Sequence, residues 1–407
     1  MTLSREPHAP ADLQASEGGP LAGLRVLDLS AYVAGPFGCT LLADLGADVV
    51  KIEPPTGDNL RNYPSTLAGA CRFFVGVNRG KRSLVIDLKN PEGLDTLRSL
   101  VARADVLVHN FRPGVAERLG IGYEELSAGH PRLIYAGLSG YGESSGPLQA
   151  RAGFDQVLQN MTGFCVAQAE PGATPEVVYG SVIDYYAASM LALGLTSALY
   201  ARERTGRGQR IAVSLLGAAL CAQSGRFVWA EGEAADVDRG TRSTGVNAIF
   251  PTREGHLYIS ATTPHFWRAL CRHIGRADMA DDPAYDTPQK RVARQDEITR
   301  CIVAGLAAHT AEEWEARLAG EVPCSVSRPI EEMFEHPQVQ AEGHLATYRH
   351  PEIGSYRSFR TPIQFQGTPL VQPRPAPTLG QHGEEVLREA GLTPARIAAL
   401  RDAGAVG

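Results

Sequence analysis

Short apolar runs alternate with helix-like stretches along the first half of the chain. Runs typical of buried strands lie at 24–29, 48–52, 83–88, 105–108 and 132–138. Helix patterns separate them, and the first, over 36–46, has proline near its start and glycine past its end. Strands that alternate with helices of about 10–15 residues form βαβ units and a largely parallel sheet. Right-handed crossovers put helices on both faces, so the pattern predicts an open, doubly wound α/β domain.

The second half of the chain has a different pattern. Residues 184–204 form the longest helical candidate, which ends at Thr205-Gly206-Arg207-Gly208 and leads into an alternating strand at 209–215. A further strand is predicted at 257–260, and helices are predicted near 265–274, 291–307 and 311–319. Proline and glycine at 350–380 predict a long irregular return, and 384–403 predicts one or two helices.

These shifts in pattern predict two folded domains. The segment EAADVDRGTRSTG, at 233–245, is rich in charged residues and glycine and is typical of a linker. The expected parts are a flexible leader at 1–20, a large Rossmann-like domain at 21–230, a linker at 231–245, a smaller α+β domain at 246–330, and a return segment with C-terminal helices that complete the large domain at 331–407.

Composition narrows the class of protein. The chain has 407 residues, of which 43% are hydrophobic and 21% charged, as in globular proteins. Its net charge of −6 argues against a surface built to bind nucleic acid. The first twenty residues lack the apolar core of a signal peptide, and no run approaches the roughly 18 apolar residues of a membrane span. With seven dispersed cysteines and no CxxC pair, the sequence predicts a cytoplasmic protein with reduced thiols and no nucleic-acid or membrane partner.

Several familiar catalytic motifs are absent from the sequence. Ser30-Ala31-Tyr32-Val33-Ala34-Gly35-Pro36 follows the first predicted strand, where a dinucleotide-binding fold has GxGxxG. No GxxxxGKS/T, HExxH or GxSxG occurs, and the eleven histidines are scattered. The sequence therefore gives no support to a phosphate-binding loop, a hydrolase triad or a metal site.

Two basic loops stand beside predicted strands. Asn110-Phe111-Arg112-Pro113-Gly114 follows one strand, with Arg118 farther along, and Lys81 lies in a basic run just before another. In an open parallel sheet, ligands bind beyond the carboxyl ends of the strands. An amide, an aromatic ring and a guanidinium at that edge suit a nucleotide with phosphates, although pattern alone favours a solvated loop with a turn at Pro113-Gly114.

Two acids stand in apolar surroundings at the starts of helical patterns. Asp155 lies in GFDQVL and Asp184 in SVIDYYA. Either could be an N-cap that accepts backbone N–H bonds, and spacing alone favours that role. Either could instead be a carboxylate nucleophile, because a helix N-terminus favours its ionised form. Such a carboxylate attacks a thioester carbonyl to form a mixed anhydride, which a thiolate then attacks.

Six blocks of the sequence resemble, in the same order, the family III CoA-transferases, a superfamily that also contains α-methylacyl-CoA racemase. The blocks span about 24–216 and are LRVLDLSAYVAGPFGCTLLADLGADVVKIEPP, NRGKRSLVIDLKNPEG, ADVLVHNFRPGVAERLGIGYEEL, PRLIYAGLSGYG, GFDQVLQNMTG and TGRGQRIAVSLL. The resemblance implies a two-domain subunit that interlocks with its partner in a homodimer, with active sites at the interface. It also implies that the large domain binds CoA, which arrives as an acyl-CoA substrate and not as a permanently bound cofactor.

The resemblance also implies roles for individual residues. Those implied to bind CoA are Tyr32, Val33, Ala34, Lys81, Asn110, Phe111, Arg112 and Arg118. Arg118 is expected toward the phosphates of CoA, and Arg112 fills a position that varies among relatives. Asp184 matches the family's nucleophile, and Asp155 matches its companion acid near the thioester.

Two departures from the family pattern bear on the reaction. Racemase members carry a histidine just before the acid at the 155 position, as one of two bases for α-proton exchange, and here Phe154 cannot take a proton. Formyl- and oxalyl-type transferases carry a run of glycines, whereas the corresponding stretch, Ser243–Phe250, has one. Transferase chemistry is therefore favoured, with small dicarboxylates of the succinate, malate, citramalate, mesaconate or itaconate type as substrates.

The resulting hypothesis is an enzyme that moves CoA from an acyl-CoA to a carboxylic acid through an aspartyl anhydride and an aspartyl-CoA thioester on Asp184. Three alternatives stay open. They are CoA transfer between the two carboxylates of one dicarboxylyl-CoA, an acyl-CoA racemase or isomerase, and a CoA-binding module without activity.

Overall fold

The computed structural model of the protein describes residues 18–169, 172–234, 237, 246–370 and 374–407. The chain divides into two compact units, one formed by Met1–Val228 and Gln340–Gly407 and the other by Trp229–Val339. Most of the expected leader at 1–20 and of the expected linker at 231–245 lies outside the described residues. The larger unit is therefore made from two chain segments that the smaller unit separates in sequence.

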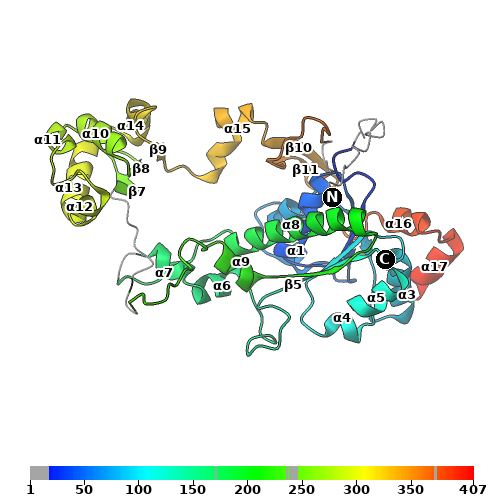
Figure 1. Ribbon diagram of the computed structural model, residues 1–407. Helices are drawn as coiled ribbons and strands as arrows, with labels where there is room; N and C mark the ends of the chain where they lie inside the picture. The colour runs from blue at the N-terminus through cyan, green and yellow to red at the C-terminus, as the bar shows by residue number, and fades with distance from the viewer. Residues whose placement is uncertain (1–17, 170–171, 235–236, 238–245, 371–373) are drawn as a thin grey trace, which may run out of the picture. The chain divides into compact units, whose positions relative to one another are not determined.

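A six-stranded parallel sheet forms the centre of the larger unit (Figure 1). Its strands are β1 (Arg25–Asp28), β2 (Asp48–Glu53), β3 (Arg82–Val85), β4 (Val106–His109), β5 (Ile134–Ser139) and β6 (Arg210–Ser214). Their order is β3-β2-β1-β4-β5-β6, which confirms the predicted parallel α/β sheet. The winding of the chain reverses between β1 and β4, so the carboxyl ends of these two neighbouring strands meet at the reversal.

Helices cover both faces of this sheet (Figure 1). Successive strand residues point in opposite directions, so each face presents apolar side chains to one layer of helices. Val26, Val49 and Val106 pack against one layer, and Leu27 and Leu107 pack against the other. The first layer consists of α1 (Ala34–Asp44), α8 (Val182–Thr205) and α9 (Leu215–Cys221). The second includes α3 (Pro91–Val101), α5 (Tyr123–Gly129), α16 (Gly383–Glu389) and α17 (Pro394–Asp402).

The helix α8 is the centre of the first layer. With 24 residues it is long and apolar enough to cross a membrane, judged by length and composition only. Its side chains Ala187, Leu191 and Leu195 are fully buried in the same core as α1. Gly38 lets α1 come close, because a Cβ at that position would lie 2.8 Å from the Leu191 side chain. Packing in the core of this unit therefore accounts for the apolar composition of α8.

The last segment of the chain lies along the free edge of β3. His382 N donates to Ser83 O at 2.9 Å, and Gly407 N donates to Val85 O at 3.2 Å. An isolated antiparallel bridge joins the same two segments. Leu387 of α16 is fully buried in the core of the second layer, so this segment contributes both to the sheet edge and to the core.

The smaller unit combines an antiparallel sheet with helices. Its strands, in sheet order, are β7 (Val246–Pro251), β8 (His256–Ala261) and β9 (Cys324–Val326). Its helices are α10 (Pro264–His273), α11 (Ala277–Ala280), α12 (Pro288–Val292), α13 (Gln295–Leu306) and α14 (Ala311–Leu318). Leu257, Ile259 and Trp267 belong to its buried core. Only β8 was predicted as a strand, because β7 and β9 lack a regular alternation of apolar and polar residues.

The prediction of an irregular stretch at 350–380 is wrong for its first ten residues, and the described residues that follow them, 360–370 and 374–380, contain no helix or strand. The stretch at 350–380, predicted to be irregular, begins within an antiparallel hairpin formed by β10 (Leu345–His350) and β11 (Gly354–Phe359). Pro351 lies in the turn between the two strands, and Gly354, which follows the turn, has a φ of +72°. These two residues therefore connect paired strands instead of preventing a sheet. Tyr348 and Tyr356 stack across the pair with ring centroids 5.2 Å apart, which supports the hairpin.

Short helices connect the larger elements. They are η1 (Asn59–Asn62), α2 (Arg72–Val77), α4 (Val115–Arg118), α6 (Asp155–Met161), α7 (Phe164–Gln168), η2 (Ile330–Phe334) and α15 (Pro337–Ala341). Two of them, α4 and α6, begin soon after the carboxyl ends of β4 and β5. They therefore border the edge of the sheet where a ligand site is expected.

Candidate active site

A cavity of about 210 Å³ opens where β1, β4 and β5 end. The residues that line it after these strands are Tyr32, Val33, Ala34, Asn110, Phe111, Arg112, Pro113, Leu138, Ser139 and Gly140. Asp184 contributes from the first turn of α8, and Phe154 from the residues just before α6. The cavity lies where the winding of the sheet reverses, which is the usual ligand site of an open α/β sheet.

Asn110 ties together the two loops that meet in the cavity. Its Nδ2 donates to Ala31 O at 2.7 Å, and its Oδ1 accepts from Ala31 N at 3.0 Å. Both ends of the amide are therefore used to join the loop after β4 to the loop after β1. Asn110 therefore helps to fix the shape of the cavity that it lines.

Two aromatic rings form part of the cavity wall. Tyr32 has a φ of +67°, in the left-handed region that residues other than glycine seldom adopt. Its ring meets Phe154 edge to face with centroids 5.7 Å apart, and its hydroxyl accepts a hydrogen bond from Asn59 Nδ2 at 2.9 Å. Phe154 is 47% exposed, so this pair offers an apolar surface that a bound molecule can cover.

Phe111 is held by the last residue of β4. Its ring stacks on His109 with centroids 5.2 Å apart, and its backbone N–H donates to His109 Nδ1 at 3.2 Å. Burial lowers the pKa of His109 to about 4, so the imidazole is neutral at pH 7 and carries its proton on Nε2. Sequence reasoning missed this histidine, because a single histidine at the end of an apolar strand gives no distinctive pattern.

Asp184 carries the ionisable carboxyl group that α8 presents to the cavity. Burial, with a further contribution from the nearby charge of Asp155, raises the pKa of Asp184 to about 7. No cation among the described residues forms an ion pair with it. The carboxyl group is therefore close to half ionised at neutral pH, and its ionised form is poorly compensated and correspondingly basic.

Asp155 caps the helix that carries Asp184. It is 2% exposed, and its Oδ2 accepts from Ile183 N at 2.6 Å and from Asp184 N at 2.9 Å. Its Oδ1 accepts from Gln159 Nε2 at 2.5 Å. Ser181, the residue at the N-cap position of α8, has a φ of +59° and makes no side-chain cap. Asp155 thus supplies from α6 the bonds that an N-cap residue normally supplies, which leaves the Asp184 side chain free of that role.

Two of the residues expected to bind CoA, Lys81 and Arg118, do not line the main cavity. Lys81 is fully buried, and its three N–H donors are used by Asp28 Oδ2 at 2.8 Å, Asn78 Oδ1 at 2.8 Å and Pro36 O at 2.7 Å. It can therefore influence a ligand only through the residues that it holds. Arg112 is exposed and lines both the main cavity and a neighbouring one of about 160 Å³. Arg118, on α4, is exposed and lines neither.

The structure thus brings together seven of the ten residues singled out from the sequence. Those that line the main cavity are Tyr32, Val33, Ala34, Asn110, Phe111, Arg112 and Asp184. Lys81 and Asp155 lie behind the cavity wall as supports of its turn and of α8. In the part of the chain that the structure describes, no group of three or more His, Cys, Asp or Glu side chains could hold a metal ion.

Comparison with known proteins decides the family. The family described as CoA-transferase family III matches residues 21–383. The chain belongs to the family III CoA-transferases. It is 34% identical over 382 residues to a succinate–glutarate CoA-transferase from Agrobacterium fabrum, covering 91% of this chain and 95% of that one. It is 35% identical over 378 residues to an acetyl-CoA:oxalate CoA-transferase from Acetobacter aceti, covering 91% and 96%.

Solved structures of similar chains support the same assignment. A CaiB/BaiF family protein from Brucella suis superimposes with a TM-score of 0.81 at 30% identity, covering 92% of this chain and 100% of that one. Rv3272 from Mycobacterium tuberculosis superimposes with a TM-score of 0.80 at 30% identity, covering 90% and 99%. The expected family is confirmed, and this transferase uses CoA thioesters as substrates.

Several polar residues of the two cavities were not predicted. Gln149 and Arg151, in the loop before α6, line the main cavity. Glu143 and Arg210 form an ion pair at 2.8 Å in the neighbouring cavity. These residues lie in loops and at a strand start without motifs, so only the folded chain brings them beside the NFRPG loop.

Proposed function

We propose that this enzyme moves CoA from a small dicarboxylyl-CoA to a carboxylic acid acceptor through covalent intermediates on Asp184. The observation that carries the proposal is the Asp184 carboxyl group, which lies in the cavity at the reversal of the sheet with no cation of the described chain beside it. Its raised pKa makes the ionised carboxylate more basic and hence a better nucleophile. The substrates named for the relative from Agrobacterium fabrum, succinate and glutarate, support the dicarboxylate class. Oxalate, named for the relative from Acetobacter aceti, is of the type that the single glycine at 243–250 disfavours.

The reaction begins when an oxygen of the Asp184 carboxylate attacks the thioester carbonyl of the donor. The carbon–sulfur bond breaks, which leaves a mixed anhydride on Asp184 and the thiolate of CoA. The thiolate then attacks the side-chain carbonyl carbon of Asp184, the donor acid leaves as its carboxylate, and an aspartyl-CoA thioester remains. No water enters either step, so the energy of the thioester bond is retained.

The acceptor reverses this sequence. Its carboxylate attacks the aspartyl-CoA thioester, releases the thiolate and forms a second anhydride with Asp184. The thiolate attacks the acyl carbon of the acceptor in that anhydride, which gives the new acyl-CoA and restores the Asp184 carboxylate. Tyr32, Phe111 and Phe154 provide apolar surface in the cavity, and this surface helps to keep water from the anhydride.

Other residues support this chemistry indirectly. Asp155 holds the first turn of α8, so that the Asp184 backbone is fixed while its side chain reacts. Phe154 stands beside Asp155 and cannot act as a base, which disfavours exchange of the α-proton and therefore a racemase. The exposed guanidinium groups of Arg112 and Arg118 are available for the phosphates of CoA.

We also propose the interlocked homodimer that the family resemblance implies. Phe227 and Val228, near the end of the first segment of the larger unit, are 68% and 63% exposed, and adjacent exposed apolar residues are typical of an interaction surface. Analytical ultracentrifugation should give twice the chain mass of 43.6 kDa. A monomer at working concentrations would exclude the homodimer.

Trapping of the covalent intermediate tests the proposed reaction. Wild type is mixed with a panel of acyl-CoAs that includes succinyl-CoA and acetyl-CoA, quenched with hydroxylamine or borohydride, and analysed by peptide mass spectrometry. The peptide that contains Asp184 should be modified when the enzyme is mixed with an acyl-CoA thioester and not when it is mixed with CoA plus the free acid. Asp184→Ala should give no acyl-CoA product. Turnover without any modified aspartate would refute the covalent route, and turnover without an added acceptor would indicate transfer within one dicarboxylyl-CoA.

A further inference from the structure

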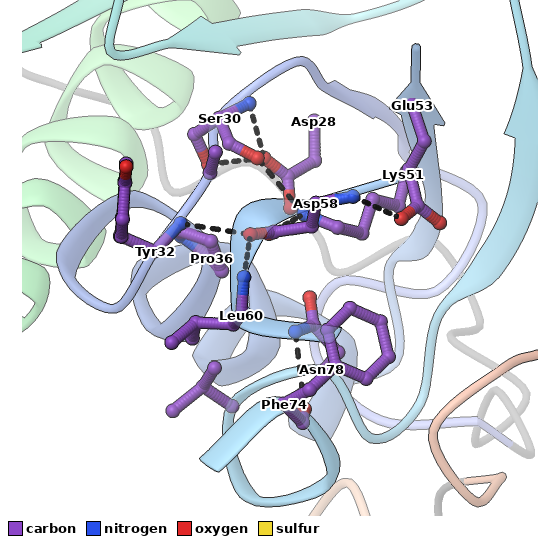
Figure 2. Close-up of polar contacts among 12 residues, drawn as sticks. Asp28, Ser30, Tyr32, Pro36, Lys51, Glu53, Asp58, Leu60, Phe74 and Asn78 are labelled. Carbon is purple, nitrogen blue, oxygen red and sulfur yellow. Dashed lines mark hydrogen bonds and ion pairs between the residues drawn. The ribbon is translucent and has the colours of Figure 1, made fainter. Parts of the chain in front are cut away.

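Four charged side chains are buried beneath the turn that joins β1 to α1, and Figure 2 labels three of them, Asp28, Lys51 and Asp58. Asp28, Lys51 and Lys81 have no exposed surface, and Asp58 is 2% exposed. Burial of a charge is costly unless the charge is paired and its remaining hydrogen-bonding capacity is used. We define Asp28, Lys51, Asp58 and Lys81 as the charge cluster. The groups to which these four side chains bind therefore indicate what the cluster does.

The cluster consists of two ion pairs. Lys81 Nζ lies 2.8 Å from Asp28 Oδ2, and Lys51 Nζ lies 2.9 Å from Asp58 Oδ2. Burial alone would raise the pKa of Asp28, but Lys81 and Lys51 more than compensate and lower it to about 2. The Asp28 carboxylate is therefore ionised at neutral pH, beside the two buried lysines.

Three further bonds of the cluster go to the backbone of Ser30 and Tyr32. Ser30 N donates to Asp28 Oδ1 at 3.0 Å, and Lys51 Nζ donates to Ser30 O at 2.8 Å. Tyr32 N donates to Asp58 Oδ1 at 3.2 Å, as Figure 2 shows. Together with the two bonds from Asn110 to Ala31, these contacts fix the polar backbone groups of the turn from Ser30 N to Tyr32 N.

This turn needs such restraint because Tyr32 is in an unfavourable conformation. A residue other than glycine at a φ of +67° is strained, and it persists only where its surroundings hold it. The strain places the Tyr32 ring edge to face with Phe154 and leads directly into Val33 and Ala34. All four of these residues line the cavity that contains Asp184.

We propose that Asp58 is a positioning residue for CoA binding, which holds Tyr32 in the left-handed conformation through the Tyr32 N–H and the ion pair with Lys51. Asp58 is buried and does not line the cavity, so it acts on a ligand through Tyr32. The proposal rests on the proposed function only in that CoA occupies this cavity. It also gives Lys81 a role, because Lys81 joins Asp28 to Pro36 O in the first turn of α1.

The affinity of the enzyme for CoA, measured by isothermal titration calorimetry, tests the proposal without requiring the covalent reaction. Asp58→Ala should raise the Kd about tenfold, because Tyr32 is released. Asp58→Asn retains the acceptor oxygen for Tyr32 N and Leu60 N but loses the charge opposite Lys51. It should melt at a lower temperature than wild type and still bind CoA within about twofold of wild type.

A matched control is the buried pair of Asp44 with Arg79, at the other end of α1. Asp44→Asn creates a comparable buried defect and should lower the melting temperature without changing the Kd for CoA. If the Kd rises in Asp44→Asn and Asp58→Asn in proportion to lost stability, Asp58 has only a structural role and the proposal is wrong. This comparison can overturn the proposal even if Asp58→Ala does not fold.

A double-mutant cycle shows whether the effect passes through Tyr32. Glycine adopts a φ of +67° without strain and has no ring to be positioned. In a Tyr32→Gly background, Asp58→Ala should therefore change the Kd by no more than about twofold, whereas additive effects would overturn the proposal. If wild type binds CoA but no aspartyl intermediate is trapped, the proposed reaction fails and the role of Asp58 is still tested.

Discussion

Two groups of carboxylates beside the same cavity show opposite uses of an acidic side chain. In the charge cluster, Asp28 and Asp58 each face a buried lysine, and their remaining oxygen atoms hold backbone N–H groups. At the start of α8, Asp155 holds backbone N–H groups in the same way, but Asp184 has no cation beside it among the described residues. Three of these four aspartates support structure, and the fourth, Asp184, is the nucleophile that we propose.

The two groups of carboxylates differ in whether a positive charge lies beside the buried carboxyl group, and not in whether that group is buried. Burial acts on the pKa of both Asp28 and Asp184 in the upward direction. Two lysines bring the pKa of Asp28 down to about 2, whereas the neighbouring charge of Asp155 adds to burial and helps to bring that of Asp184 to about 7. The charges that lie beside a buried carboxyl group thus set the basicity of each of these aspartates.

The largest effect is expected from Asp184→Ala. Loss of the nucleophile should reduce CoA exchange by at least about 10³-fold, as measured by the rate of acyl-CoA formation. Because the pKa of Asp184 is raised above its unfolded value of 3.8, its ionisation weakens the fold as the pH rises through about 7. The variant should therefore melt at the same or a higher temperature at pH 8. Near-normal exchange by Asp184→Ala would show that Asp184 is not the nucleophile, and the two groups of carboxylates would then not differ in their use.

The next largest effect is expected in the charge cluster. Asp28→Asn leaves Lys81 buried without its counter-charge and should lower the free energy of unfolding by about 3–5 kcal/mol, measured by urea denaturation. The control is Asp95→Asn, in an exposed pair with Arg98, which should change it by less than about 1 kcal/mol. Equal small effects of the two substitutions would show that the cluster does not depend on compensation.

The pH dependence of labelling measures the basicity of Asp184 directly. The protonated acid is a poor nucleophile, so the rate at which an acyl-CoA modifies Asp184 should rise as the pH rises through about 7 and then level off. Below that pH the rate should fall about tenfold for each pH unit. Rapid-quench mass spectrometry from pH 5.5 to about 8.5 gives the profile, with circular dichroism as the control for folding. A flat profile would mean that Asp184 is fully ionised throughout.

The smallest effect is expected from Asp155. Asp155→Ala removes the acceptor for Ile183 N and Asp184 N and should lower the free energy of unfolding by about 1–2 kcal/mol. Asp155→Asn keeps an acceptor oxygen and should cost less. Both changes remove a negative charge beside Asp184, lower its pKa and move the rise in labelling rate to lower pH. An unchanged pH profile in both variants would show that burial alone sets the basicity of Asp184.

Much of the fold could be predicted because it depends on local patterns. Buried strands such as β2 and amphipathic helices such as α3 follow from the order of apolar and polar residues. The hairpin of β10 and β11 could not be predicted in this way, because Pro351 and Gly354 suit a turn between strands as well as an irregular segment. The sequence contains the turn signal, and only the pairing of Tyr348 with Tyr356 shows that the turn joins two strands and is not part of an irregular segment.

The site could be predicted where chemistry coincides with a strand or helix end. Asn110 and Asp184 were singled out on that basis, and both line the cavity. Lys81 was expected near CoA because it lies in a basic run before a strand and because the family resemblance implies that role, but the carboxylate that pairs with it, Asp28, lies 53 positions away. Asp155 likewise caps a helix whose first turn is 28 positions away. Such partners are set by tertiary structure, and no local spacing reveals them.

The contact between β3 and the end of the second segment affects the order in which the protein can form. Ser83 is synthesised 299 positions before His382, the residue whose N–H it accepts. Until then the outer edge of β3 has unpaired backbone groups that another chain could bind. The smaller unit, by contrast, is translated without interruption and can fold while that edge is still open. For much of its synthesis the larger unit is therefore an unfinished sheet, whose outer edge is complete only when the end of the chain has been made.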